Sequence, residues 1–288
     1  MPIAVQRVSY TYMAGGPYET AALHDVSLTI EDGEFVALIG HTGSGKSTLV
    51  QHLNGLLAPT SGRVLIDGVD LAAKGTDRRA VRFHVGLVFQ YPENQLFEET
   101  VEKDIAFGPK NLGLPAEEVD RRVREAMRKV ALPYEKFAQR SVFELSGGQM
   151  RRVAIAGVLA MEPKVLVLDE PCAGLDPRGQ AEILGLIAKL HDESGTTILM
   201  VSHSMDDVGA LAERVIVMDH GKIAMDGSPE DVFSRGEALR AMGLDVPQAV
   251  ELAERLRARG IPVPPKAYRQ EELCAAILAA LGKGEGTC

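Results

Sequence analysis

Short runs of apolar residues, separated by stretches with helical periodicity, dominate the middle of this chain. Glu34–Ile39 is the first such run, and Val165–Leu168 and Thr197–Val201 each follow a helical stretch. Runs of this length and composition are typical of strands that are buried on both faces of a sheet. Because these strands alternate with helices, the pattern predicts an α/β core with a largely parallel sheet.

The N-terminal segment follows a different pattern. Positions 3–30 alternate between apolar and polar residues, with Gly15–Pro17 as a turn. This alternation predicts an antiparallel β edge that leads into the first buried strand. Further short strands are predicted at Arg63–Ile66 and Val85–Phe89.

Two regions are predicted to be mainly helical. Residues 99–145 are rich in Glu, Arg and Ala, with breaks expected at Gly108–Pro109 and at Pro133, and another helix is expected over 146–160. Together they predict an inserted helical subdomain at about 91–160. After Gly227 the sequence pattern changes and predicts short helices separated by prolines. We therefore divide the chain into a domain at 1–229 and a C-terminal helical extension at 230–288.

Composition narrows the function classes. The chain has 288 residues, a formal net charge of −9 and a pI near 5.4. A net negative charge of this size does not favour binding to the phosphate backbone of nucleic acid, so we predict no nucleic-acid partner. Local basic clusters such as Arg151–Arg152 are expected to lie on solvated faces. No run of 18 apolar residues occurs, so a role at a membrane would need another chain to span it.

A glycine-rich loop between the predicted strand at 34–39 and the helix after it carries the first chemical signal. Residues 40–47 read G-H-T-G-S-G-K-S, which matches the P-loop spacing Gly-x4-Gly-Lys-Ser. Such a loop directs backbone N–H groups at phosphate oxygens, while Lys46 reaches the β- and γ-phosphates and Ser47 ligates Mg²⁺. The predicted phosphate-binding residues are Gly40, His41, Thr42, Gly43, Ser44, Gly45, Lys46, Ser47 and Thr48.

Two further motifs support an ATPase. Asp169 and Glu170 end a buried strand, at the edge where open α/β sheets bind ligands. Asp169 suits the Mg²⁺ shell, and Glu170 suits the polarisation of a water that attacks the γ-phosphate. Residues 145–149 read L-S-G-G-Q directly before a helix, so the Ser146 hydroxyl and the N–H groups of Gly147 and Gly148 are placed for a cap or for phosphate.

The order of these motifs resembles an ABC-type ATPase from about Val5 to Val232. The resemblance implies that Gln90 is the Q-loop glutamine, touching Mg²⁺ or the attacking water, and that Asp176 belongs to the D-loop. It also implies that His203 is the switch histidine and that Tyr12 stacks on adenine. Alternation alone places Tyr10 and Tyr12 on one face and does not choose between them.

In this family two ATPase subunits pair head-to-tail. By resemblance, Ser146, Gly147, Gly148 and Gln149 would therefore complete the nucleotide site of a second subunit, either a paralogue or a second copy.

A narrower resemblance lies in Y-P-E-N-Q-L-F-E-E-T-V at 91–101, in D-I-A-F-G-P at 104–109 and in Thr42. These stretches are similar to the second of two paralogous ATPases of energy-coupling factor (ECF) transporters. That likeness implies ATP and Mg²⁺ as cofactors and uptake of vitamins or other micronutrients. It implies two membrane partners, a transmembrane coupling protein (T component) and a substrate-binding protein (S component), on whose cytoplasmic side the chain would sit. It also implies that the extension helps dimerisation.

Alternatives remain open at this point. A cobalt, nickel or amino-acid importer would use a similar ATPase, and a non-transport ABC ATPase is a more distant alternative. Leu96 and Phe97, close behind Gln90, would either dock a helix of the membrane protein or pack in the core.

Overall fold

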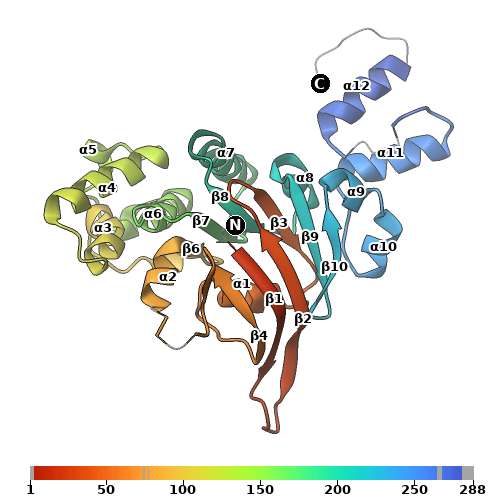
Figure 1. Ribbon diagram of the computed structural model, residues 1–288. Helices are drawn as coiled ribbons and strands as arrows, with labels where there is room; N and C mark the ends of the chain where they lie inside the picture. The colour runs from red at the N-terminus through yellow and green to blue at the C-terminus, as the bar shows by residue number, and fades with distance from the viewer. Residues whose placement is uncertain (1–2, 74, 77, 265–267, 281–288) are drawn as a thin grey trace.

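The computed structural model of the chain describes residues 3–73, 75–76, 78–264 and 268–280 (Figure 1). Within these residues the largest sheet has six strands in the order β10-β9-β3-β8-β7-β6. All neighbours are parallel except β9 and β10, which confirms the predicted α/β core. The strands are β3 (Phe35–Ile39), β6 (Val85–Val88), β7 (Val165–Asp169), β8 (Thr197–Val201), β9 (Arg214–Asp219) and β10 (Lys222–Gly227).

A second, antiparallel sheet confirms the prediction for the N-terminal segment. Its strands lie in the order β2-β1-β4-β5, and β1 pairs with both β2 and β4. The bounds are β1 (Ile3–Tyr12), β2 (Thr20–Ile30), β4 (Ser61–Ile66) and β5 (Val69–Asp70). The pairing register of β1 with β2 shifts between Val5 and Thr11.

The hydrophobic core lies on both faces of the six-stranded sheet. Successive side chains of a strand point to opposite faces, so Val36 and Leu38 of β3 join the cluster formed with the antiparallel sheet and helix α1 (Lys46–Leu53). Phe35, Ala37 and Ile39 join the other cluster, which includes residues of helices α6 (Gly147–Leu159), α7 (Pro177–Ser194) and α8 (Met205–Leu211). Burial of all five residues explains why this strand reads as a continuous apolar run.

The region after β6 is helical. It contains η1 (Pro92–Gln95), α3 (Val101–Asn111), α4 (Ala116–Lys129), α5 (Tyr134–Phe137), η2 (Val142–Glu144) and α6 (Gly147–Leu159), and α2 (Arg78–His84) precedes β6.

The predicted break at Gly108–Pro109 is wrong, because α3 continues to Asn111. A Cβ atom at Gly108 would lie 2.7 Å from Cγ of Met161, so glycine is required there for close packing. Pro109 lies in the last turn, where it removes one helical hydrogen bond.

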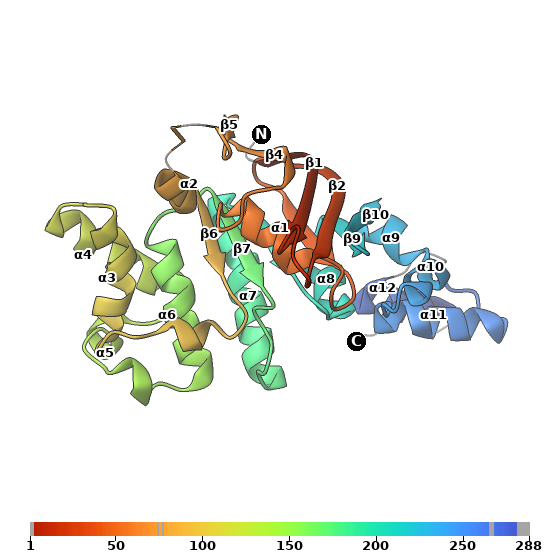
Figure 2. The same cartoon turned by 90° about the horizontal axis from the view of Figure 1, so that it is seen from below.

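The remaining helices flank the sheet or follow it. Helix α7 (Pro177–Ser194) and helix α8 (Met205–Leu211) connect the central strands. After β10 come α9 (Pro229–Phe233), α10 (Gly236–Ala241), α11 (Gln248–Ala258) and α12 (Gln270–Ala280). Because β6 and β10 are opposite edges of the sheet, α3–α6 and α9–α12 lie at opposite ends of the molecule, as both views show (Figures 1 and 2).

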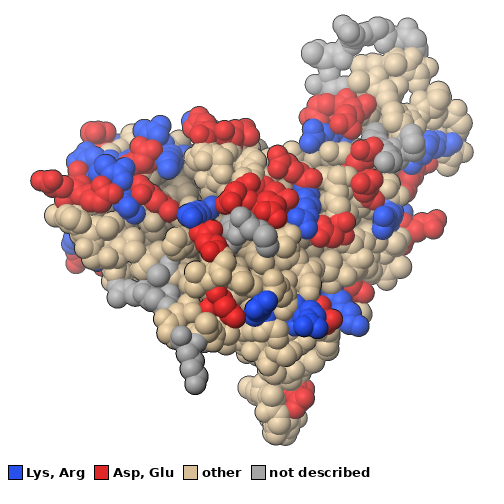
Figure 3. All heavy atoms as spheres, viewed as in Figure 1, with Lys and Arg blue, Asp and Glu red and all other residues tan. Residues whose placement is uncertain are grey.

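Charged side chains of both signs are interspersed over the face viewed in Figure 3. Among the described residues, every helix is too short or too polar to cross a membrane.

Candidate functional site

The P-loop connects β3 to α1, and its glycines are required by close backbone approaches. A Cβ atom at Gly40 would lie 2.4 Å from the carbonyl oxygen of Met218. At Gly45, where φ is 104°, a Cβ atom would lie 2.7 Å from the carbonyl oxygen of Ala22. The loop is therefore held tightly against β9 and β2, with Thr42 and Gly43 exposed at its outer side.

Lys46 is a buried cation at the start of α1. Its Nζ donates to the carbonyl oxygens of Gly40, at 2.6 Å, and of His41, at 3.1 Å. Burial lowers the pKa of Lys46 from its usual value, while the negative charges of Glu170 and Asp169 oppose that shift. Because its direct partners are neutral carbonyls, an anion that enters the loop would stabilise this ammonium.

Two carboxylates lie at the end of β7. Burial raises the pKa of Asp169 above its usual value, and the charge of Glu170 adds to the rise, while Lys46 and His203 oppose it. Glu170 adopts a left-handed backbone conformation with φ of 49°, and its N–H donates to the carbonyl oxygen of Val201 at 3.0 Å. A left-handed non-glycine residue is unusual, and here it directly follows the end of β7.

Gln90 and His203 meet at Glu170. The Nε2 group of Gln90 donates to one carboxylate oxygen at 2.9 Å, and Nε2 of His203 lies 2.9 Å from the other. These residues follow β6, β7 and β8, which are adjacent parallel strands, so their carboxyl ends meet at one edge of the sheet. The structure thus brings together the three residues that the sequence suggested for hydrolysis.

Tyr12 and Tyr10 differ in their surroundings. Their rings meet edge to face, with centroids 4.8 Å apart, which agrees with their predicted common face. Tyr10 packs against His52 and the core, whereas Tyr12 is exposed and its hydroxyl lies 3.1 Å from Oγ1 of Thr48 in the first turn of α1. Of the two, Tyr12 is the ring that lies open beside the P-loop helix.

The L-S-G-G-Q segment forms a capped helix start. Ser146 accepts from the N–H of Gln149, and the Gln149 side chain accepts from the N–H of Ser146, which is a capping box for α6. Open space surrounds Gly147 and Gly148, and in the described chain no hydrogen bond joins this segment to the P-loop. Asp176 likewise caps α7 through the N–H of Gly179 at 2.7 Å, and it is exposed.

Arg151 is a buried link beside the site that the sequence analysis missed, because a solvated face was expected for it. Its side chain is only 1% exposed and pairs with Glu93 of η1 at 3.0 Å. Its Nη1 donates to the carbonyl oxygens of Pro171 and Ala173, both at 2.9 Å. One guanidinium therefore joins the segment after Gln90, the helix after Ser146 and the loop after Glu170. The neighbouring Arg152 pairs with the half-exposed Glu182.

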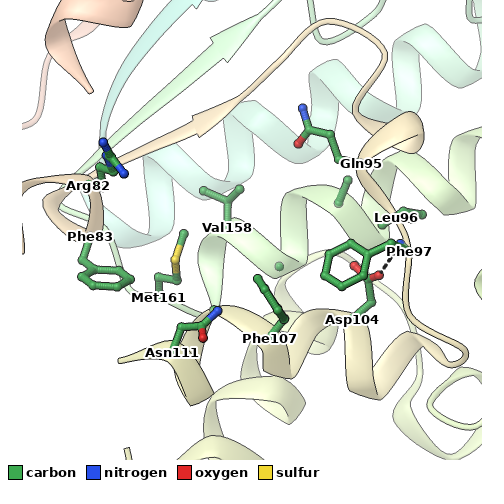
Figure 4. Close-up of a pocket in the computed structure, with 13 residues that line it drawn as sticks. Arg82, Phe83, Gln95, Leu96, Phe97, Asp104, Phe107, Asn111, Val158 and Met161 are labelled. Atoms are coloured by element: carbon green, nitrogen blue, oxygen red, sulfur yellow. Dashed lines mark hydrogen bonds between the residues drawn. The ribbon is translucent and has the colours of Figure 1, made fainter. Parts of the chain in front are cut away.

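A groove of about 570 Å³ opens close behind Gln90, between α3 and α6 (Figure 4). Phe97 and Phe107 meet edge to face at 4.8 Å on its wall, and both are exposed. The buried carboxylate of Asp104 accepts from the N–H groups of Phe97 and Glu98, each at 3.0 Å, and so holds the Phe97 loop in place. Leu96 is buried, so the two apolar residues of the predicted pair have different environments.

Comparison with known proteins identifies relatives over most of the chain. A family model described as ABC transporter matches residues 23–173. The energy-coupling factor transporter ATP-binding protein EcfA2 of Symbiobacterium thermophilum is 56% identical over 286 residues, which are 99% of each chain. The EcfA2 protein of Clostridium tetani is 58% identical over 252 residues, or 88% of each chain.

Solved structures are similar as well. The structure of cbiO1 from Clostridium perfringens, described as part of the ABC transporter complex cbiONQ, aligns with a TM-score of 0.74 and 40% identity. It covers 88% of this chain and 98% of that one. The ATP-binding cassette MJ0796, described as a dimeric post-hydrolysis state bound to ADP and Pi, aligns with a TM-score of 0.69 and 31% identity over 79% of this chain and 98% of its own.

Proposed function

The chain belongs to the ABC transporter family, among the energy-coupling factor transporter ATP-binding proteins, and on that premise we propose that it hydrolyses ATP to drive an importer. The observation that carries the proposal is the contact of Gln90 and His203 with Glu170, at the sheet edge where the P-loop also begins. The transported compounds in this proposal are vitamins or other micronutrients.

The residues present fit ATP and Mg²⁺. The glycine-lined loop, the desolvated Lys46 and a buried Ser44 hydroxyl without a partner in the described chain form a cradle suited to phosphate oxygens. Ser47, Gln90 and Asp169 offer oxygen ligands of the kind that Mg²⁺ takes. When bound, Mg²⁺ would neutralise charge on the phosphate oxygens. The exposed ring of Tyr12 is the proposed surface for adenine.

Glu170 is the proposed general base, and the structure suggests how it is restrained. One of its carboxylate oxygens accepts a hydrogen bond from Gln90, and the other lies 2.9 Å from Nε2 of His203. Each carboxylate oxygen keeps a further lone pair, so an attacking water can bond to Glu170 beside these partners and give up its proton there. We assign to His203 a contact with the γ-phosphate, toward which it would turn, while Gln90 stays beside the attacking water.

A second subunit is proposed to complete the site. The exposed helix start at Ser146, with open space beside Gly147 and Gly148, suits the phosphates of nucleotide held by a partner's P-loop. Asp176 is exposed at the start of α7 and would lie in the same interface. The division into an ATPase domain at 1–229 and an extension at 230–288 that supports dimerisation belongs to the same proposal.

The groove beside Phe97 is proposed to receive a short helix of the transmembrane coupling protein, with a substrate-binding membrane protein attached to that partner. An amphipathic helix seats its apolar face in such a groove, and Phe97 and Phe107 supply exposed aromatic anchors. Arg151 and Glu93 would link movement of this helix to Gln90 and to the loop after Glu170. In this arrangement the chain sits on the cytoplasmic face of the membrane.

Purification of the tagged full-length chain from native membranes, followed by mass spectrometry, tests the assembly. We expect a second ABC ATPase and membrane proteins with several spans to be recovered with it. Recovery of the chain from membranes without any such protein would contradict the proposal.

Phe97→Ala tests the groove, with Phe143→Ala as a matched control. Both rings are exposed, and Phe143, on η2, does not line the groove. We expect both variants to keep the melting temperature of the isolated chain, and Phe97→Ala alone to lose the membrane partner. A marked fall in melting temperature for Phe97→Ala, with normal assembly, would instead show that Phe97 packs in the core.

A further inference from the structure

His41, Asp219 and His220 form a cluster at the opposite side of the P-loop from the hydrolytic residues. His41 is the second residue of the P-loop, Asp219 ends β9, and His220 lies in the turn before β10. Nε2 of His41 lies 3.1 Å from Oδ1 of Asp219, and Nε2 of His220 lies 3.8 Å from the same oxygen. Among the described residues, this is the group of three whose ligand atoms lie within 4.8 Å of one another.

The hydrogen bonds of His41 leave a chemical problem. Its Nδ1 lies 2.8 Å from the carbonyl oxygen of Thr42, which can only accept, so Nδ1 carries a proton. In a neutral imidazole Nε2 then presents a lone pair, and here that lone pair faces a carboxylate oxygen at 3.1 Å. Two acceptors at this distance need a positive species between them, either a second proton on the ring or a bound cation.

The donor set favours a transition metal. Two imidazole nitrogens and one carboxylate oxygen suit Zn²⁺ and Co²⁺, whereas Mg²⁺ and Ca²⁺ prefer oxygen ligands alone. In a tetrahedral zinc site with bonds of about 2.0–2.1 Å, neighbouring ligand atoms lie roughly 3.4 Å apart. The two spacings around Asp219, 3.1 and 3.8 Å, bracket that value. The bond from Nδ1 of His41 to a backbone carbonyl is the outer contact that orients metal-bound histidines.

We propose that His41, Asp219 and His220 bind one divalent transition-metal ion, with water in the remaining position. The side chain of His220 is 85% exposed, so it is free to rotate onto an ion held by the other two residues. The ion would join the P-loop to the β9–β10 turn, two segments already connected by the bond from Gly221 N–H to the carbonyl oxygen of Ser44 at 2.9 Å. This site is separate from Ser47, Gln90 and Asp169, and its occupation does not depend on hydrolysis.

The test is a calorimetric titration of the purified full-length chain with Zn²⁺, in the absence of nucleotide, with Co²⁺ absorption as a second readout. We expect one equivalent to bind to the wild type. His220→Asn and Asp219→Asn should each weaken binding by at least about 10-fold, since the first removes an imidazole ligand and the second replaces a charged carboxylate oxygen by a neutral amide oxygen. Asn tolerates the left-handed backbone of His220, where φ is 44°, so the turn is preserved. The melting temperature without metal should be unchanged in His220→Asn.

Two control variants locate the ion. His84→Ala disrupts a histidine–carboxylate contact of 3.7 Å with Asp67, and His203→Ala disrupts the contact with Glu170. Among the described residues, neither pair belongs to a group of three potential metal ligands. Both controls should keep the wild-type Zn²⁺ affinity. The proposal is overturned if the wild type binds no ion, if His220→Asn binds as tightly as the wild type, or if His203→Ala abolishes binding. The first result would assign the His41–Asp219 contact to a protonated histidine.

Discussion

Truncation of Arg151 should destabilise the chain far more than truncation of its sequence neighbour. Arg151→Ala leaves the Glu93 carboxylate and the carbonyl oxygens of Pro171 and Ala173 without their donor. Loss of one partner from a buried ion pair costs about 3–5 kcal/mol. The lower part of that range applies here, because Glu93 is 23% exposed and regains some hydration. We therefore expect a fall of about 3 kcal/mol in the free energy of unfolding.

Arg152→Ala is the matched control. Arg152 is 17% exposed, pairs with Glu182, which is 47% exposed, and donates to the carbonyl oxygen of Val130 at 3.3 Å. Its truncation should therefore cost about 1 kcal/mol, less than that of Arg151. Arg151→Lys keeps the charge. An ammonium lacks the planar guanidinium geometry that donates at once to one carboxylate and two carbonyl oxygens, so Arg151→Lys should also be destabilising. Urea unfolding followed by far-ultraviolet circular dichroism measures all three variants. Equal losses for Arg151→Ala and Arg152→Ala would refute the assignment of Arg151 as a buried link.

The remaining predictions concern nucleotide and assembly. Lys46→Ala should weaken ATP binding in calorimetry, because it removes the buried ammonium from the P-loop. As a control, replacement of the exposed Lys189 by alanine should leave the ATP affinity unchanged. An unchanged affinity in Lys46→Ala would exclude a role of Lys46 in phosphate binding. Ser146→Arg should abolish hydrolysis and nucleotide-dependent dimer formation yet spare ATP binding by the isolated chain, because the added side chain blocks only the partner's approach. Loss of binding by the isolated Ser146→Arg chain would show instead that the motif serves its own P-loop.

The elements that were predictable from sequence are those specified by local residue types. The buried strand predicted at 165–168 and the helix after Ser146 were evident from composition and capping residues, and both are found, the strand extending to Asp169. Glu170 was named from its place at a strand end, and Gln90 and His203 from the family resemblance, but their mutual contact is seen only in the structure. Their catalytic roles stay predictions.

The features that escaped prediction depend on distant parts of the chain. Arg151 is buried because its partner Glu93 lies 58 positions earlier and its carbonyl acceptors lie 20 and 22 positions later. Gly108 lies inside a helix, where the close approach of Met161 from a neighbouring segment accounts for the glycine. Local rules for a glycine followed by a proline do not reveal such a contact. For the same reason, the sequence left Leu96 and Phe97 as one pair, although tertiary packing buries the first and exposes the second.

The most direct test of the account is the rate of phosphate release by the assembled transporter carrying Glu170→Gln. We expect ATP still to bind, since Glu170 contacts Gln90 and His203 rather than the P-loop backbone. We expect turnover to fall by roughly 10²-fold or more, because the glutamine amide cannot take a proton from water. Turnover close to that of the wild type, with ATP binding intact, would contradict the assignment of Glu170 as the general base.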